Sequence, residues 1–350
     1  MRPILVTGGA GFIGSNLADR LAGQGHDVLI YDALAREGVQ RNLDWLKARH
    51  PRRVSSVIAD VRDVDALARA AEDASAVFHL AAQVAVTTSM VEPVEDFDIN
   101  MRATLTLLEA LRKRNDRTPL LFASTNKVYG GLEDLDFDLE GDAYVPRDPE
   151  IRARGVGEGR SLDFHTPYGC SKGAADQYVL DYARSFGVPT AVMRMSCIYG
   201  PRQMGTEDQG WVAHFLIRAL EGRPISIFGD GCQVRDILDV SDAVDAWTAA
   251  YARIDQVSGR AFNLGGGPDN AVSLRQVLAE IERLAGRKLE LEFSDWRPGD
   301  QRYYVSDTRR ARSELGLGAP RDWREGVAAL ADWLQSERAS AEPRLAAAVA

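Results

Sequence analysis

Near its N-terminus the chain reads Ile4-Leu-Val-Thr-Gly-Gly-Ala-Gly-Phe-Ile-Gly14. Its first four residues are an apolar, β-branched run typical of a buried strand, and a helical pattern follows the glycines. Three glycines, at positions 8, 11 and 14, permit a tight turn, close approach of a pyrophosphate, and packing of the helix on the strand. A helix that begins there presents free N–H groups to phosphate. We therefore expect a dinucleotide at this turn, in contact with Gly8, Gly11, Phe12 and Ile13.

The next apolar run, residues 28–31, ends at Asp32. An acid at this position accepts hydrogen bonds from both ribose hydroxyls of the adenosine and repels a 2′-phosphate, which favours NAD over NADP. Two alternatives stay open: Asp32 as a turn or capping acid, and NADP held with the help of Arg36. Asp60 and Val61, at the end of a third strand, are expected to hold the edge of the adenine.

Short apolar runs alternate with helical patterns along the first two thirds of the chain. This alternation predicts an α/β fold, a Rossmann-type doubly wound parallel sheet with a smaller C-terminal α/β substrate domain. The predicted strands are residues 4–7, 28–31, 55–58, 76–80, 120–123 and 190–194, and the predicted helices include 64–71, 99–114, 211–220, 274–284 and 323–333.

Domain boundaries follow from where the alternation loosens. We assign residues 1–195 and about 233–268 to the NAD-binding domain, 196–232 and 269–337 to the substrate domain, and 338–350 to a flexible tail. Residues 131–163 form a long acidic insertion without clear periodicity, which is expected to be either functional or disordered.

Composition excludes several classes of function. A net charge of −9 disfavours non-specific nucleic-acid binding. The three cysteines and five histidines fit no metal-ligand spacing, so no metal is expected. Neither a signal sequence nor an apolar run long enough to span a membrane is evident, which predicts a cytoplasmic protein without a membrane partner.

Tyr168-Gly-Cys-Ser-Lys172 has the pattern Y-x-x-x-K at the start of a helix. Residues four apart share a helix face. A tyrosine with a pKa of about 10 is a poor base at neutral pH, and a neighbouring ammonium, together with a cationic nicotinamide, would lower that pKa. We interpret Tyr168 as the catalytic acid and base and Lys172 as its partner. The intervening Cys170 is interpreted as a packing residue, and His79 as a buried, hydrogen-bonded histidine rather than a catalyst.

At this point the chain resembles the extended short-chain dehydrogenase/reductase family of NAD-dependent epimerases and dehydratases, over nearly its whole length. The matching motifs are Gly8 to Gly14, Asp32, Asp60-Val61, His79-Leu-Ala-Ala82, Asn100, Ser124-Thr125, Val128-Tyr-Gly130, Tyr168, Lys172, Tyr199-Gly-Pro-Arg202, Arg235-Asp236 and Asn263-Leu-Gly-Gly266. The resemblance implies that Thr125 holds the reacting sugar hydroxyl beside Tyr168. It also implies that Leu80, Ala81, Ala82 and Asn100 contact the cofactor.

The two residues after Thr125 are Asn126 and Lys127, where the 4,6-dehydratases of this family have Asp-Glu. Without that carboxylate pair no group is evident to remove the carbon-5 proton and protonate the leaving hydroxyl, so dehydration is disfavoured. Longer strings are similar to the CDP-paratose 2-epimerase (CDP-tyvelose 2-epimerase) group within the family. They are Gln83 to Ser89, Ser124 to Gly130, Leu162 to Tyr178 and Asp208 to Val212.

This resemblance implies epimerisation of a nucleotide-linked hexose, most simply a CDP-hexose at carbon 2, through a transient keto sugar. A UDP-sugar 4-epimerase, a reductase, a 4,6-dehydratase and a non-enzymatic dinucleotide sensor are the alternatives. Arg235 and Arg302 are expected to clamp the diphosphate, because a guanidinium binds phosphate oxygens in pairs. The other expected substrate contacts are Gln83, Asn126, Lys127, His165, Arg202 and Gln203. Apolar stripes on residues 99–114 and 171–186 predict a homodimer or homotetramer.

Overall fold

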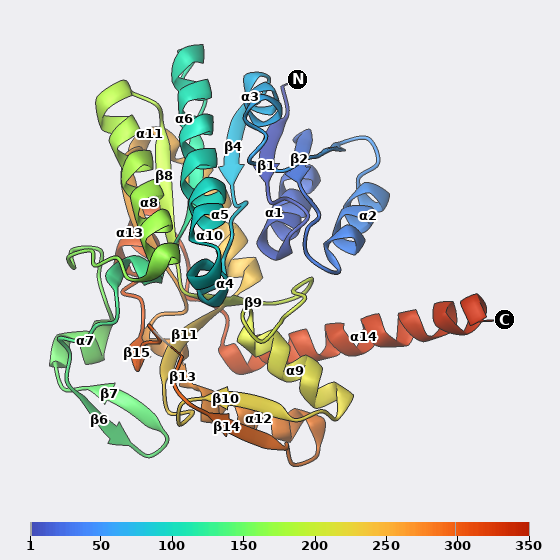
Figure 1. Cartoon of the computed structure of the whole chain (residues 1–350), viewed down its shortest axis with the longest axis vertical. Coiled ribbons are helices and arrows are strands. Elements are labelled where there is room, and N and C mark those ends of the chain that lie inside the picture. The colour runs from blue at the N-terminus through green and yellow to red at the C-terminus, as the bar shows by residue number, and fades with distance from the viewer. Residues whose placement is uncertain (1, 298, 350) are drawn as a thin grey trace.

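The computed structural model describes residues 2–297 and 299–349. Its centre is a seven-stranded parallel sheet with strand order β12-β8-β5-β4-β1-β2-β3 (Figure 1). The seven strands are β1 (Ile4–Thr7), β2 (Val28–Asp32), β3 (Val54–Ile58), β4 (Ala76–His79), β5 (Leu120–Thr125), β8 (Thr190–Met195) and β12 (Arg260–Leu264). All six strands expected from the sequence are present, and β12 extends the sheet at one edge. The predicted α/β, Rossmann-type sheet is confirmed.

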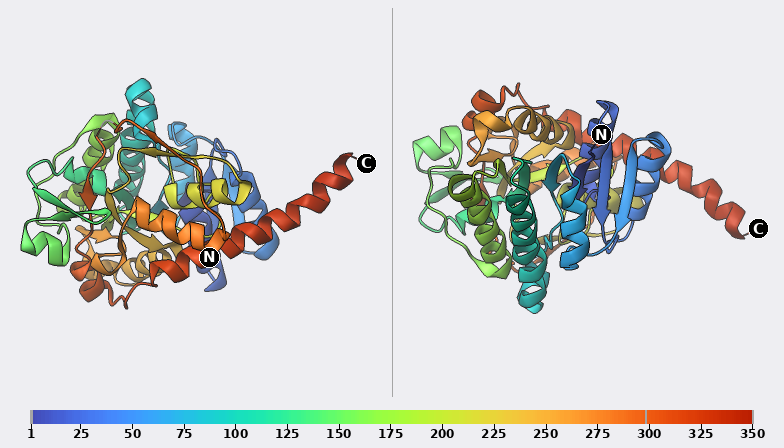
Figure 2. Two further views of the ribbon diagram at one scale, coloured as in Figure 1. Left: turned by 90° about the horizontal axis from the view of Figure 1, so that it is seen from below. Right: turned by 90° about the horizontal axis from the view of Figure 1, so that it is seen from above.

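Helices cover both faces of this sheet (Figure 2). Alternate residues of β1 enter different cores: Ile4 and Val6 pack on one face, and Leu5 packs on the other. The first face is covered by α1 (Phe12–Gly23), α2 (Val39–Arg49), α10 (Val240–Ala252), α11 (Ile254–Val257) and α13 (Arg309–Leu315). The second is covered by α3 (Val64–Glu72), α6 (Ala103–Arg114) and α8 (Thr166–Phe186). A strand buried on both faces has no polar side, which explains the continuous apolar runs in the sequence.

Short helical segments connect β4 to α6 and follow β5. They are α4 (Val86–Val91), α5 (Pro93–Phe97), the π-helical turn η1 (Asp98–Arg102) and the 3₁₀ turn η2 (Asn126–Tyr129). Because parallel strands end at one edge of the sheet, these segments gather beside the glycine-rich turn.

A smaller lobe forms below this sheet in Figure 1. Its strands make one sheet of order β13-β11-β15, with β9 paired to β11, and a two-stranded sheet of β10 and β14. These strands are β9 (Cys197–Tyr199), β10 (Ile225–Phe228), β11 (Val234–Asp239), β13 (Ala271–Ser273), β14 (Leu291–Ser294) and β15 (Tyr303–Tyr304). Its helical segments are α9 (Trp211–Glu221), η3 (Pro268–Asn270), α12 (Leu274–Ala285) and α14 (Trp323–Val349).

The observed structure differs from the domain boundaries expected from the sequence at two places. Strand β11 lies within residues 233–268 yet pairs with strands of the smaller lobe, whereas β12 joins the large sheet and α10 packs against α1. Residues 338–349, expected to be a flexible tail, continue α14, which extends beyond the body of the molecule in Figures 1 and 2. Alanine has the highest helix propensity, so an Ala-rich segment readily prolongs a helix. Residue 350 lies outside the described residues.

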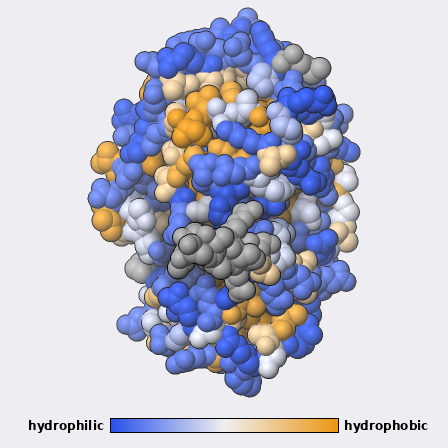
Figure 3. Space-filling model, turned by 90° about the vertical axis from the view of Figure 1, so that its right-hand side faces the viewer, coloured by the Kyte–Doolittle hydropathy of each residue, from blue (hydrophilic) through white to orange (hydrophobic). Residues whose placement is uncertain are grey.

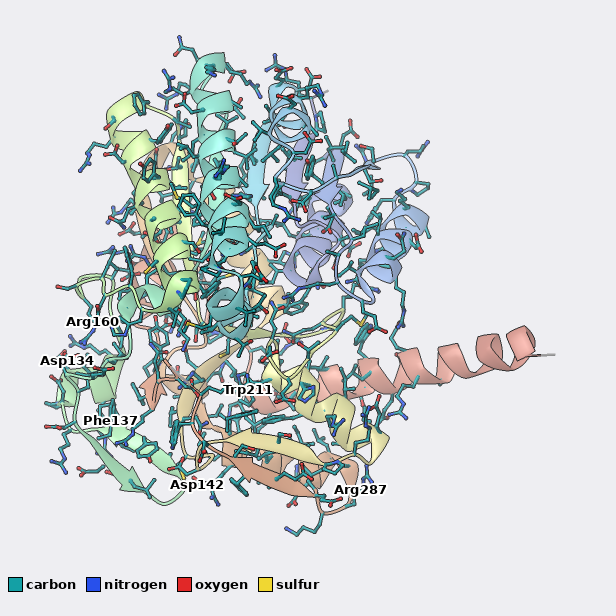
Figure 4. All side chains as sticks on the ribbon, viewed as in Figure 1. Asp134, Phe137, Asp142, Arg160, Trp211 and Arg287 are labelled. Atoms are coloured by element: carbon teal, nitrogen blue, oxygen red, sulfur yellow. The ribbon has the colours of Figure 1, made fainter. Side chains whose placement is uncertain are left out.

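The acidic insertion is ordered. It contains the antiparallel hairpin of β6 (Phe137–Glu140) and β7 (Ala143–Pro146), followed by α7 (Pro149–Arg154). Figure 4 shows Asp134 and Arg160 side by side where the insertion begins and ends, and the two form an ion pair. Phe137 packs on Tyr303 of the smaller lobe, and the Asp142 carboxylate accepts a hydrogen bond from Gln276. These contacts lie far apart in the sequence, so no local periodicity could reveal them.

Among the described residues, no helix is long and apolar enough to cross a membrane. The same part of the chain contains no cluster of three or more histidine, cysteine, aspartate or glutamate side chains that could hold a metal ion.

Candidate active site

A cavity of about 350 Å³ lies along the edge of the large sheet where its strands end. It begins at the glycine-rich turn and reaches the Y-x-x-x-K pair. Its lining includes Gly8, Gly11, Phe12, Ile13, Gly14, Asp32, Arg36, Asp60, Val61, Leu80, Ala81, Ala82, Ser124, Tyr168, Lys172, Arg202, Gln203, Met204 and Gln209. Nearly all residues expected to bind the cofactor therefore line one continuous space.

The glycine-rich turn has no room for side chains. A Cβ on Gly14 would lie 2.2 Å from the Gly8 carbonyl oxygen, and one on Gly8 would lie 2.7 Å from the Ala81 nitrogen. Gly8 also has a φ of +67°, which favours glycine. Helix α1 begins after Gly11 without a side-chain cap, so the N–H groups of its first turn remain available to an anion. This cradle fits the pyrophosphate of a dinucleotide.

Asp32 is held in place at the end of β2. Its two carboxylate oxygens accept hydrogen bonds from the backbone nitrogens of Ala10, at 3.0 Å, and Leu34, at 2.9 Å. Each oxygen keeps a further lone pair for a ribose hydroxyl. Arg36 lies close enough to Tyr168 to lower the pKa of that tyrosine, so its guanidinium faces the reactive end of the cavity. The geometry therefore fits NAD.

Two further cofactor candidates differ in their surroundings. Asp60 is paired with Arg62 at 2.7 Å, which lowers the pKa of its carboxyl group, and it lines the cavity. Asn100 is buried and uses its amide to hold the backbone of Gln83 through two hydrogen bonds of 3.0 Å. The Gln83 side chain in turn bonds the backbone of Ala85. In this structure Asn100 and Gln83 shape the loop that follows β4.

The proposed catalytic residues come together from two elements. Thr125 ends β5, and Tyr168 and Lys172 occupy the first turns of α8, where both are buried. Burial raises the pKa of Tyr168 to about 12, while a hydrogen bond with Thr125 and the charge of Arg36 act in the opposite direction. Burial lowers the pKa of Lys172 to about 7. The sequence argument expected a neighbouring ammonium, together with a cationic nicotinamide, to lower the pKa of Tyr168. In this structure the groups that lower it are Thr125 and Arg36, and burial outweighs them.

Helix α8 starts where it does for local reasons. Pro167 occupies its first turn, a position at which the missing N–H costs nothing. The backbone nitrogen of Tyr168 donates to Ser89 Oγ at 3.2 Å. Gly173 leaves space for the ring of Phe164, since a Cβ there would lie 2.4 Å from it. Cys170, expected to be a packing residue, is exposed instead, because position 170 lies on the outer face of α8.

Asn126 and Lys127 meet a segment of the smaller lobe, residues 299–301, which we call the strap. Asn126 Nδ2 donates to Gln301 Oε1 at 3.3 Å, and Lys127 Nζ donates to the Gly299 carbonyl at 3.0 Å. The Asp300 carboxylate lies 2.6 Å from Arg235 and 3.9 Å from Lys127. Burial lowers the pKa of Lys127 to about 8. The side chains of Arg235 and Lys127 thus both lie near the negatively charged carboxylate of Asp300.

The remaining substrate candidates are more scattered. Arg202 has a φ of +71° and stacks on Trp45, with the guanidinium carbon 3.3 Å from the ring centroid. Gln203 donates to the Ile198 carbonyl at 3.1 Å, while its buried Oε1 has no hydrogen-bond partner among the described residues. His165 pairs with Asp163 at 2.9 Å. Arg302 is exposed, and its guanidinium carbon lies 5.5 Å from the centroid of the Tyr144 ring on the β6–β7 hairpin.

Sequence reasoning missed several residues at this site. Met204 and Gln209 line the cavity, and Asp300 lies between the two cations. Asp96, Asp176 and Arg194 are buried, and both carboxylates raise the pKa of Lys172 against the effect of burial. None has a sequence signal of its own, since each acts through a partner distant in the chain. His79 is buried as expected, bonded to Thr7 at 2.7 Å and Thr104 at 3.1 Å.

Comparison with known proteins agrees with this geometry. Residues 4–265 match the NAD dependent epimerase/dehydratase family, and the chain belongs to it. The chain is 40% identical to CDP-paratose 2-epimerase of Salmonella typhi over 340 residues, which are 95% of this chain and 99% of that one. It is therefore an NAD-dependent enzyme of the nucleotide-sugar epimerases and dehydratases.

Solved structures show the same fold. UDP-glucose 4-epimerase of Thermotoga maritima, solved with UDP-glucose, superposes with a TM-score of 0.81 at 29% identity, covering 96% of this chain and 99% of the other. UDP-glucose 4-epimerase of Thermus thermophilus, solved with NAD, gives a TM-score of 0.79 at 30% identity, covering 95% and 99%.

Proposed function

We propose that this enzyme inverts carbon 2 of a hexose linked to CDP, a substrate of the CDP-paratose or CDP-tyvelose type, by transient oxidation to a keto sugar. The observation that best supports this choice is the similarity to CDP-paratose 2-epimerase, which extends over nearly the whole chain. Asn126 and Lys127 support it as well, because neither can replace the carboxylate pair that a dehydratase needs.

The residues at the reactive end have complementary tasks in this reaction. NAD, when bound in the cavity, supplies a reversible acceptor for the hydride of the sugar carbon. Tyr168 takes the proton of the sugar hydroxyl and later returns it, and Thr125 holds the same oxygen. Lys172 and Arg36 provide positive charge that favours the phenolate of Tyr168. The hydride and the proton both return to the sugar, so the reaction is redox-neutral and needs no second substrate.

We infer that Arg235 and Lys127 bind the diphosphate that links sugar and nucleoside. In the structure they share the carboxylate of Asp300, an anion of similar chemistry. Gln203 offers a buried oxygen that is unpaired within the described part of the chain and that a sugar hydroxyl can satisfy. Epimerisation at carbon 4 of a UDP-sugar would use the same catalytic residues, so the choice of carbon 2 rests on the similarity to the relative.

The test is incubation with CDP-paratose, CDP-tyvelose and UDP-glucose in D2O, followed by proton NMR. We expect interconversion of the two CDP-sugars with full retention of the hydrogen on carbon 2, because a hydride held by the enzyme does not exchange with solvent. Interconversion of UDP-glucose and UDP-galactose alone would identify a 4-epimerase. A released keto sugar, or turnover that requires added NADH, would identify a dehydratase or a reductase. No turnover of any of the three, with NAD still bound, would favour a dinucleotide sensor.

We also propose a homodimer, or a homotetramer built from it, that forms through α6, α8 and the neighbouring short helices. Helices α6 and α8 lie side by side on one face of the large sheet. Large hydrophobic side chains are exposed on or near them: Met90, Val91, Val94, Phe97, Tyr178 and Phe186. Hydrophilic side chains predominate on the face shown in Figure 3. Exposed apolar side chains gathered on one set of helices are typical of an interface.

A further inference from the structure

The loop between β9 and α9 brings a piece of the smaller lobe to the cofactor cavity. We call its first part, residues 200–204, the clasp. Arg202, Gln203 and Met204 of the clasp line the same cavity as the glycine-rich turn and Asp32. The cavity that fits NAD is therefore bounded by both lobes, although its cradle belongs to the large sheet.

Two asparagine side chains of the large domain hold the backbone of the clasp. Asn16, on α1, donates from Nδ2 to the Pro201 carbonyl at 3.0 Å. The buried Asn42, on α2, donates from Nδ2 to the carbonyls of Arg202, at 3.2 Å, and Ala10, at 3.1 Å. Because Ala10 belongs to the glycine-rich turn, one amide group joins this turn to the clasp.

Arg202 is held in the clasp by an aromatic ring. Its guanidinium carbon lies 3.3 Å from the centroid of the Trp45 ring on α2. The carboxylates that act on its charge, those of Glu337 and Asp19, are paired with other arginines, each at 2.7 Å. A guanidinium over the face of an indole is attracted by the electrons of the ring, so Trp45 and Arg202 form a cation–π pair.

The backbone of Arg202 indicates that its surroundings impose this arrangement. Its φ of +71° lies in the left-handed region, which a residue with a side chain adopts at a cost. Such a conformation persists where contacts fix it, and here those contacts are the Trp45 ring and the Asn42 amide. The clasp is therefore fixed at this residue through both the side chain and the carbonyl group.

Trp45 lies where α2, the clasp and α14 meet. Its side chain packs on the core beneath one face of the large sheet. Arg202 also lies 6.0 Å from the ring centroid of Trp333 on α14. Arg41 of α2 pairs with Glu337 of α14 at 2.7 Å. Trp45 therefore connects the rigid core of the large domain to the clasp, whose residues form part of the cavity wall.

We propose that Trp45 is a positioning residue of the cofactor site. It holds Arg202, and with it the clasp, against the large domain, so that the cavity stays closed over NAD until the hydride has returned to the sugar. Trp45 acts through Arg202, which itself lines the cavity. An epimerase that lost its reduced cofactor earlier would release a keto sugar in place of the epimer. This inference rests on the reversible use of NAD in the proposed function.

The size of the effect follows from the contact that is removed. Truncation of Trp45 deletes the ring beneath Arg202 and leaves Arg202, Gln203 and Met204 unchanged in the sequence. A cation–π contact corresponds to about a two- to thirtyfold change in an equilibrium or a rate. We therefore expect NAD to leave Trp45→Ala about two- to thirtyfold faster than it leaves the wild type. Trp45→Phe keeps an aromatic face and is expected to lie between the two.

The experiment measures the rate at which NAD dissociates. Each protein is loaded with radiolabelled NAD and chased with excess unlabelled NAD, and the retained label is followed over time. Arg202→Ala removes the same contact from the side of the clasp, and the double variant completes a double-mutant cycle. Because Trp45 acts through Arg202, the double variant is expected to lose NAD only as fast as Arg202→Ala. Lys47→Ala, at an exposed position of the same helix, is the matched control and is expected to retain the wild-type rate.

Additive effects of the two substitutions, or a wild-type rate for Trp45→Ala, would overturn the proposal. The thermal midpoint of the NAD-free protein is measured in parallel. A lower midpoint together with an unchanged dissociation rate would mean that Trp45 serves packing alone, which also overturns it. If Trp45→Ala does not fold, the cycle is completed with Trp45→Phe, since Arg202→Ala changes only a loop.

Sugar turnover gives a second measurement. We expect Trp45→Ala to release more keto sugar per turnover than the wild type, because the cofactor leaves before the hydride returns. An unchanged yield of keto sugar despite faster loss of NAD would overturn the role in retaining the hydride. Absence of turnover in the wild type would count against the proposed function alone, because the dissociation of NAD is measured without sugar.

Discussion

At the scale of single residues, Tyr168 shows two opposing requirements. Burial raises the pKa of its hydroxyl, whereas its proposed role as a base needs that pKa to be lower. The side chain is 8% exposed and its pKa is about 12, so the free site holds a protonated tyrosine. It becomes a base only with positive charge nearby, which Lys172, Arg36 and a nicotinamide ring supply.

Tyr168→Phe tests the assignment directly. The variant retains the ring and loses the proton-transfer group, a loss that typically costs about 10²- to 10⁴-fold in kcat. NAD affinity, measured by titration calorimetry, is expected to change little. Tyr178→Phe is the matched control, since Tyr178 lies on the same helix and is exposed. Full turnover by Tyr168→Phe would show that another group moves the proton.

We propose that Asp32 determines the choice of cofactor, and Asp32→Asn tests this role. A hydrogen bond to a charged group contributes about 1.5 to 3 kcal/mol, so we expect NAD to bind about ten- to a hundredfold more weakly. Calorimetric titration with NAD and NADP measures both affinities. Asp44→Asn on the exposed side of α2 is the control. Tighter binding of NADP than of NAD by the wild type would contradict the interpretation of Asp32.

The burial of His79 leads us to expect that the free energy of unfolding depends on pH. Its pKa is about 3 in the fold and close to 6.5 in an unfolded chain, so below pH 6.5 the unfolded state binds the extra proton. The stabilisation is complete above pH 6.5 and is lost as the pH falls toward 3, by at most about 1.4 kcal/mol per pH unit. Urea unfolding at several pH values should show a smaller loss for His79→Gln. Equal slopes for wild type and variant would refute this role, and the partly exposed His26 provides a control substitution.

At the scale of elements, the strap joins the two lobes. Residues 299–301 contact η2 of the large domain and β11 of the smaller lobe, and Asp300 occupies the position between Arg235 and Lys127. An anionic substrate must share or replace this carboxylate.

Asp300→Asn is therefore expected to bind anions more tightly, by several-fold, because it removes an internal competitor. The probes are CDP and inorganic pyrophosphate, titrated by calorimetry. Asp295→Asn is the matched control, since Asp295 is exposed a few residues away. Weaker binding by Asp300→Asn would mean that the carboxylate orients Arg235 rather than competing for it.

At the scale of the whole molecule, two lobes contribute to one site. The large sheet provides the cofactor cradle and the proposed catalytic residues, and the smaller lobe provides Arg235 and the strap. The exposed apolar side chains of α4, α5 and α8 lie outside this site, which is why we expect them to bind a second copy.

Light scattering is expected to give at least twice the mass of one 38.4 kDa chain. The double variant Val94→Asp with Tyr178→Asp should shift the protein toward the monomer, because it places charges in an apolar interface. Ile58→Asp, an exposed apolar position on β3, should leave the mass unchanged. A light-scattering mass equal to that of one chain for the wild type would refute the proposed homodimer or homotetramer.

The sequence by itself determined six of the seven strands of the large parallel sheet, the cofactor turn, and the Tyr168–Lys172 pair. These features are local: a glycine spacing, an apolar run or an i,i+4 pair is complete within a few residues. Only the tertiary structure decided that the insertion is ordered, that β11 belongs to the smaller lobe, that Cys170 is exposed, and that Arg302 lies over Tyr144. The same holds for Trp45 and Asp300. Each acts through a partner that folding alone brings near, and burial, which sets the pKa values of Tyr168 and Lys172, is a property of the whole packed molecule.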